Sequence, residues 1–138
     1  MALPCGLLLA CSLDRFIDGE VEAPPDASGS FELLLDEVDR PDRVFEVEVV
    51  GAPPGADIVL VVTNASGGEV PCPGDIEPLC LTITGTEWSE QRSMTDDDGE
   101  AWWYVPFGAA GGDDVLGVQA YTISDEPWVS NGLRLRVP

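Results

Sequence analysis

A run of acidic residues in the second half of the chain, Asp96-Asp97-Asp98-Gly99-Glu100, has the side chains that bind hard metal ions. Calcium takes about six to eight oxygen ligands and often finds them in such a loop. The order differs from that of an EF-hand, which places Asp at alternate positions. A hairpin turn is the alternative, because Asp-Gly supplies the positive φ of tight turns. Calcium stays a hypothesis, with these candidate ligands: Asp96, Asp97 and Asp98, joined by Asp113 and Asp114 if their loop lies close.

Three aromatic residues, Trp102-Trp103-Tyr104, follow the acidic run. Consecutive residues of a strand project to opposite faces, so Trp102 and Tyr104 share a face that Trp103 does not. Flat aromatic rings among carboxylates suit sugars, whose C–H faces stack while their hydroxyls bond to the acids. The alternative is packing in the core and at the edge, since β-sandwiches routinely use tryptophan this way. All three are candidate ligand-binding residues for a glycan.

The sequence does not favour catalysis. It has no histidine, so the most common general base is missing and Ser-His-Asp or Cys-His arrangements cannot form. Paired carboxylates could serve a glycosidase, but 26 acidic residues guarantee such pairs by number alone. We therefore expect a protein that is not an enzyme, with no catalytic residues.

The start of the chain is apolar and changes abruptly to acidic residues after Cys11. The run Leu8-Leu9-Ala10-Cys11 resembles the lipobox of bacterial lipoprotein signal peptides. The resemblance implies a signal peptide over residues 1–10, acylation of the Cys11 thiol, and attachment to the outer membrane, since Ser12 follows. The acyl chains would supply the membrane affinity that an acidic chain lacks. A buried N-terminal strand with an ordinary cysteine is the alternative.

The cysteine count agrees with this resemblance. If Cys5 leaves with the leader and Cys11 is acylated, Cys72 and Cys80 remain as one pair, for which we predict a disulfide. Disulfides persist in oxidising compartments, as expected for an exported protein. A metal site is the alternative, but it would need about four N or S ligands, which the chain lacks.

The charge of the chain is extreme, with 26 acidic residues, six basic residues and a net charge of −20. Such a field repels nucleic acid and anionic membrane, whose binding depends on Lys and Arg. We therefore expect no nucleic-acid partner. Solubility explains the acidity, and binding of divalent cations is the alternative.

Residues 11–30 are rich in Pro, Ser and acid and are predicted to form a flexible linker. The folded domain is expected over residues 31–138. Residues 43–50 alternate apolar and polar side chains, as in a half-buried strand, whereas residues 57–63 are apolar on both sides, as in a central strand. About seven segments have strand patterns: residues 31–36, 43–50, 57–63, 79–84, 100–106, 115–122 and 133–137, with a weaker pattern over 91–95. No convincing helix is present. This count predicts an all-β antiparallel sandwich.

Short motifs in the second half resemble bacterial Ig-like domains. Thr95-Asp96, Gly99-Glu100-Ala101 and Val105-Pro106 are similar to a hairpin common in that family, and Val118-Gln119-Ala120 and Ser130-Asn131 to its last two strands. The resemblance implies an Ig-like β-sandwich, and it marks a fold more than an activity. The sequence as a whole predicts a lipid-anchored envelope protein, facing the periplasm or the exterior, that acts as a structural or interaction module. Its expected partner is an envelope protein or a glycan. A calcium-stabilised adhesin-like domain is a further alternative for the function.

Overall fold

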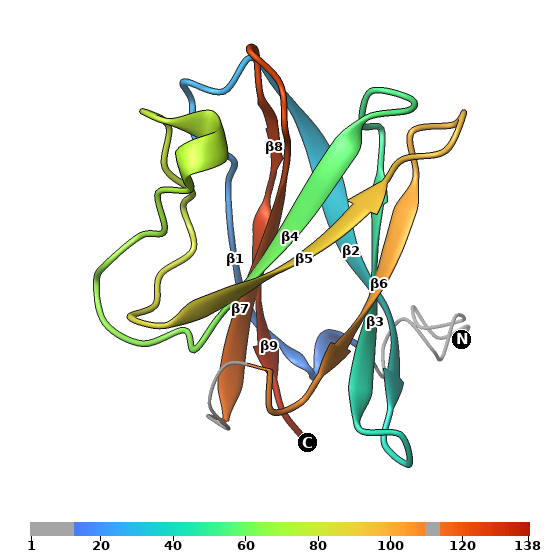
Figure 1. Cartoon of the computed structure of the whole chain (residues 1–138). Helices are drawn as coiled ribbons and strands as arrows, with labels where there is room; N and C mark the ends of the chain where they lie inside the picture. Colours follow the sequence, from blue (N-terminus) through green and yellow to red (C-terminus); the bar gives the residue numbers. More distant parts are fainter. Residues whose placement is uncertain (1–12, 110–113) are drawn as a thin grey trace, which may run out of the picture.

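A computed structural model describes residues 13–109 and 114–138, which fold as a β-sandwich (Figure 1). The described residues form nine strands and one short 3-10 turn. They are β1 (Ile17–Val21), β2 (Gly29–Asp39), β3 (Val44–Val50), β4 (Asp57–Thr63), η1 (Gly74–Ile76), β5 (Trp88–Met94), β6 (Ala101–Pro106), β7 (Val115–Thr122), β8 (Trp128–Ser130) and β9 (Gly132–Arg136). The predicted all-β class is confirmed. No helix within the described residues is long and apolar enough to cross a membrane.

Two layers of strands make the sandwich, and β2 belongs to both. The larger layer has the order β5-β4-β7-β9-β1, with β8 beside the end of β7. The smaller layer is β2-β3-β6. The first residues of β2 pair in parallel with β8, and its remaining residues pair antiparallel with β3. The sandwich is therefore continuous along this edge, and its pairing is mixed rather than wholly antiparallel.

The main core lies between the layers and follows the alternation of the strands. In β3, Phe45, Val47 and Val49 are buried, while Glu46 and Glu48 face outward, as the period of two predicted. These residues pack against inward side chains of β4, β7 and β9. Trp103 occupies the corresponding inward position of β6 and is only 4% exposed. The alternation of β6 thus directs the indole of Trp103 into the core and that of Trp102 away from it.

A second, smaller core covers the outer face of the larger layer. Val59 and Val61 of β4 and Tyr121 of β7 contact Ile76 and Leu81 from the long segment between β4 and β5. The apolar residues on both faces of β4 are buried, so its prediction as a central strand is confirmed. Cys72 and Cys80 form a disulfide within the covering segment, as predicted.

The prediction of a strand over residues 79–84 is wrong. The backbone N–H groups of Thr82 and Ile83 do not enter a ladder but donate to Oε1 of Gln119, at 2.9 and 3.0 Å. A single buried side chain on β7 thus takes the place of a neighbouring strand, while Leu81 and Ile83 pack onto the sheet. The apolar run reflects this packing rather than strand pairing.

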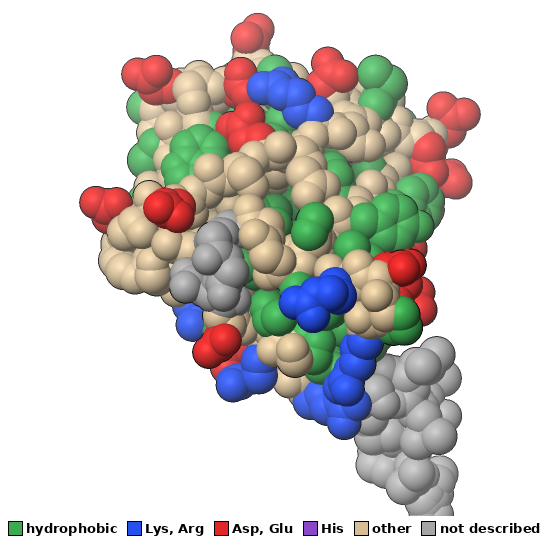
Figure 2. All heavy atoms as spheres, turned by 60° about the horizontal axis from the view of Figure 1, so that its bottom comes forward, with side chains coloured by type: hydrophobic (Ala, Val, Ile, Leu, Met, Phe, Trp, Pro, Cys, Tyr) green, Lys and Arg blue, Asp and Glu red, His purple; other side chains and the backbone are tan. Residues whose placement is uncertain are grey.

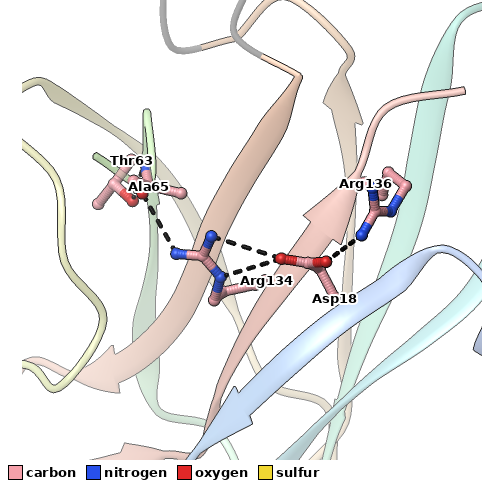
Figure 3. Close-up of polar contacts among 5 residues, drawn as sticks. All are labelled: Asp18, Thr63, Ala65, Arg134 and Arg136. Carbon is pink, nitrogen blue, oxygen red and sulfur yellow. Dashed lines mark hydrogen bonds and ion pairs between the residues drawn. The ribbon is translucent and has the colours of Figure 1, made fainter. Parts of the chain in front are cut away.

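The predicted linker over residues 11–30 is wrong for its described part. Phe16 is buried in the main core, and β1 pairs antiparallel with β9. Asp18 of β1 accepts hydrogen bonds from Arg134, at 3.4 Å, and from Arg136, and Arg134 also donates to the carbonyl of Ala65 (Figure 3). The described fold therefore begins at Leu13, well before Phe31. Cys5 and Cys11 lie outside the described residues.

Candidate functional site

The outer face of the β2-β3-β6 layer combines exposed aromatic and acidic side chains. The strand register arranges them in two rows that cross all three strands. One row consists of Leu34, Glu48 and Trp102, and the other of Glu37, Glu46 and Tyr104. A β-bulge between Leu35 and Glu37 leaves Asp36 without a partner on β3, and its carboxylate acts on both Glu46 and Glu48. We call these seven residues the acidic-aromatic face.

The aromatic residues of this face are accessible. Trp102 is 44% exposed, Tyr104 63% and Leu34 36%, the values of a solvent-facing surface rather than of a core. Of the three predicted ligand-binding residues, the structure therefore brings Trp102 and Tyr104 together at the surface. Trp103 lies on the opposite side of the sheet, in the core, and cannot contact a ligand bound to this face.

The carboxylates of the face are crowded. Glu37 and Glu46 lie directly opposite each other on neighbouring strands, an arrangement that costs energy when both are charged. Partial burial, a hydrogen bond with Glu37 and the charge of Asp36 raise the pKa of Glu46 above its ordinary value. The pKa of Glu48 is raised as well. Burial is the largest cause, and the negative charge of Asp36 and a hydrogen bond with Asp36 add to it. The carboxylates of the face therefore repel one another when they are charged.

All six arginines lie within the described residues at positions outside the two rows, and none forms an ion pair with a carboxylate of the face. Figure 2 shows most of the arginine side chains gathered at the end of the sandwich that is lowest in Figure 1. There Arg15 and Arg40 lie over the ring of Phe16, at 5.1 and 5.5 Å from its centroid, while Arg134 and Arg136 pair with Asp18. Arg15 and Arg40 thus line a surface hollow together with Asp36 and Glu37, at one border of the face, whereas Glu46, Glu48, Trp102 and Tyr104 do not line that hollow.

The predicted calcium loop forms the turn between β5 and β6. Carboxylate oxygens of Asp96, Asp98 and Glu100 lie within 4.8 Å of one another, close enough to share one ion. Glu100 was not among the predicted ligands, and Asp97 does not belong to the group. The Asp96 carboxylate also has a structural role, because its Oδ1 accepts the backbone N–H groups of Asp98 and Glu100, both at 2.9 Å.

The loop that was expected to supply extra ligands lies elsewhere. Asp57, at the start of β4, pairs with Met94, which precedes the acidic turn, whereas Thr63 at the end of β4 pairs with Gly117. Asp114 precedes β7 and therefore lies near the opposite end of the sheet from this turn. Asp113 lies outside the described residues. The structure thus offers three carboxylates at the turn rather than five.

Sequence reasoning did not single out the carboxylates of the acidic-aromatic face as site residues. The alternation of residues 43–50 does place Glu46 and Glu48 on the outer side of their strand. That Trp102 and Tyr104 lie beside them depends on the pairing of β3 with β6, which no local pattern encodes.

Comparisons with known proteins found no family model, no curated protein and no solved structure that matches the chain.

Proposed function

We propose that the chain is a lipid-anchored protein of the bacterial cell envelope, without catalytic activity, whose Ig-like β-sandwich acts as an interaction module. The observation that carries the binding role is the acidic-aromatic face. Trp102 and Tyr104 are exposed there, each directly opposite a glutamate of β3. An exposed group of aromatic residues on a rigid sheet is a typical feature of an interaction surface.

The anchor is supported by the sequence around Cys11 and by the place where the fold begins. The lipobox-like run ends at Cys11, and the first described residue, Leu13, already contacts the main core. An acyl group on Cys11 would hold the sandwich close to the membrane by its N-terminal end. The disulfide between Cys72 and Cys80 suits an exported protein, because such bonds persist in oxidising compartments.

The absence of histidine from the sequence supports a role in binding rather than in catalysis. The carboxylates of the acidic-aromatic face are close neighbours on the sheet surface, with aromatic rings beside them and no nucleophile with an adjacent base. Such a surface holds a partner in place and has no evident means of cleaving it.

The test of the anchor is the mass and location of the protein made in a bacterium that processes lipoproteins. We expect a mature N-terminus at Cys11 that carries acyl chains, and recovery of the protein with the outer membrane. Cys11→Ala should release it from the membrane while its melting temperature stays close to that of the wild type. An unmodified Cys11 in membrane-free protein would contradict the proposed anchor.

A further inference from the structure

We infer that the acidic-aromatic face binds an extended, arginine-bearing segment of a partner protein. This inference rests on the proposed function, since it names the class of partner for the same face. The charge of the face, the chemistry of its side chains and the spacing of its rows all favour such a partner.

The negative charge of the face favours a cationic partner. Glu37, Glu46 and Glu48 lie in two adjacent rows with Asp36 beside them, and no arginine lies in either row. Arg15 and Arg40 line a hollow with Asp36 and Glu37, but Glu46 and Glu48, the residues beside the aromatic rings, do not line it. Crowded carboxylates repel one another, and a bound cation removes that repulsion. A neutral sugar would stack on the rings but would leave the repulsion in place. Charge complementarity therefore favours a basic partner over a glycan.

The side-chain chemistry favours arginine over lysine. A guanidinium group is planar, stacks on aromatic rings and bonds to a carboxylate through two parallel N–H groups. Each row of the face offers both contacts, because Trp102 lies opposite Glu48 and Tyr104 lies opposite Glu46. One arginine per row can thus contact a ring and a carboxylate together. A lysine ammonium lacks the planar, bidentate geometry.

The spacing of the rows matches an extended segment. Trp102 and Tyr104 are two residues apart on β6, so their rows are separated by about 7 Å at a strand rise of 3.3–3.4 Å per residue. Alternate residues of an extended peptide have the same spacing. Within the described residues, β6 pairs with β3 alone, so a peptide that lies along β6 meets an edge strand of its layer.

The test measures binding of a fluorescein-labelled synthetic peptide that alternates arginine with threonine to the full chain, purified in detergent, by fluorescence anisotropy. The face variant is the double substitution Glu46→Gln, Glu48→Gln. Its matched control is Asp125→Asn, Glu126→Gln, which removes the same charge from two exposed residues between β7 and β8. We expect the face variant to weaken binding about five- to tenfold, as for two surface ion pairs, and the control less than about twofold.

The aromatic contribution has its own measurement. Trp102→Ala with Tyr104→Ala should weaken binding of the arginine peptide several-fold and remove most of its advantage over the same peptide made with lysine. Circular dichroism and melting of each variant establish that it is folded.

Four results would overturn the inference. The first is equal weakening of binding by the face variant and the control variant, which would indicate attraction by net charge alone. The second is absence of peptide binding at physiological salt. The third is quenching of tryptophan fluorescence by oligosaccharides while the peptide does not bind, which would assign the face to a glycan. The fourth is self-association abolished by Glu46→Gln, Glu48→Gln, which would make a second copy, through its arginine-rich end, the occupant. None of these depends on acylation of Cys11, so the inference and the anchor fail separately.

Discussion

Trp102 and Trp103 are consecutive residues whose indoles lie on opposite sides of one sheet. Trp103 is 4% exposed and belongs to the main core, whereas Trp102 is 44% exposed on the acidic-aromatic face. Their separation follows from the geometry of a strand, in which neighbouring side chains point to opposite faces. The two residues therefore offer a matched pair for separating stability from binding.

We expect Trp103→Ala to lower the free energy of unfolding by about 3–5 kcal/mol, the cost of removing a large aromatic residue from a core. Trp102→Ala should change it by about 0.5 kcal/mol or less, as for most surface substitutions. Urea denaturation followed by circular dichroism measures both. Trp103→Phe is a milder control, because Nε1 of Trp103 is buried without a hydrogen-bond partner and its loss costs no hydrogen bond. Equal effects of the two alanine substitutions would contradict the assigned orientations.

Glu46→Gln is expected to stabilise the protein at neutral pH. The pKa of Glu46 is raised by partial burial and by its acidic neighbours Glu37 and Asp36, so the folded state binds its proton more tightly than the unfolded state does. The free energy of unfolding therefore falls as pH rises from the ordinary pKa through the raised one. The gain at pH 7 should be a few tenths to about 1 kcal/mol, the range for like-charged cross-strand pairs.

The advantage of Glu46→Gln should shrink as the pH is lowered into the mildly acidic range, because the wild-type carboxylate then becomes neutral as well. Melting curves at several pH values measure this convergence. Glu126→Gln removes one charge from an exposed position between β7 and β8 and serves as the control. A gain for Glu46→Gln that persists unchanged at low pH would show that charge repulsion is not its cause.

Gln119 joins the covering segment to β7 through hydrogen bonds, and its substitution should lower the free energy of unfolding. It is fully buried, its Oε1 accepts two backbone N–H groups, and its Nε2 donates to the carbonyl of Ser130 and to Oγ1 of Thr82, both at 2.8 Å. Gln119→Met keeps the shape of the side chain but leaves these groups unpaired. We expect a loss of about 2–4 kcal/mol in urea denaturation, from several buried groups without partners.

Gln91→Met is the matched control for Gln119, because Gln91 lies half-buried on β5 of the same layer. Its effect should stay within about 0.5 kcal/mol. If both substitutions cost the same, the network around Gln119 does not hold the covering segment in place.

The acidic turn can be tested for metal binding by comparing Asp96 with Asp98. Asp96→Ala removes the acceptor of two backbone N–H groups and should cost about 1–2 kcal/mol, whereas Asp96→Asn keeps an acceptor and should cost less. Asp98→Asn leaves both bonds of the turn intact. We expect the melting temperature of the wild type to be the same in millimolar calcium and in chelator. A rise with calcium that Asp98→Asn abolishes would instead establish a metal site, because an ion that binds the native state raises its stability.

The sequence predicts well those strands whose alternation is long. The inward and outward residues of β3 and the burial of both faces of β4 follow directly from side-chain type. β1 and β8 were missed because they have five and three residues and lie in stretches rich in polar residues or Pro. Their pairing partners lie far away in the chain, so their strand character depends on tertiary contacts.

The candidate site shows the same limit. The opposite directions of Trp102 and Trp103 follow from the strand pattern, but which of the two is buried does not. The meeting of Glu48 with Trp102 and of Glu46 with Tyr104 requires the register between β3 and β6, and the crowding of Glu46 requires the bulge in β2. Register and bulges arise from the packing of the whole sandwich, which a local pattern cannot encode.

The pairing of β1 with β9 has a consequence for how the chain reaches its final state. The two strands are more than a hundred residues apart, as the contact between Asp18 and Arg134, with a separation of 116, records. A chain made from its N-terminus that has not yet reached Gly132 leaves β1 without a partner and one edge of β7 partly open. Contacts of such long range form late, since they must first overcome the entropy of closing a large loop. The nascent protein therefore keeps unpaired strand edges, which favour aggregation, until the residues of β9 have been synthesised.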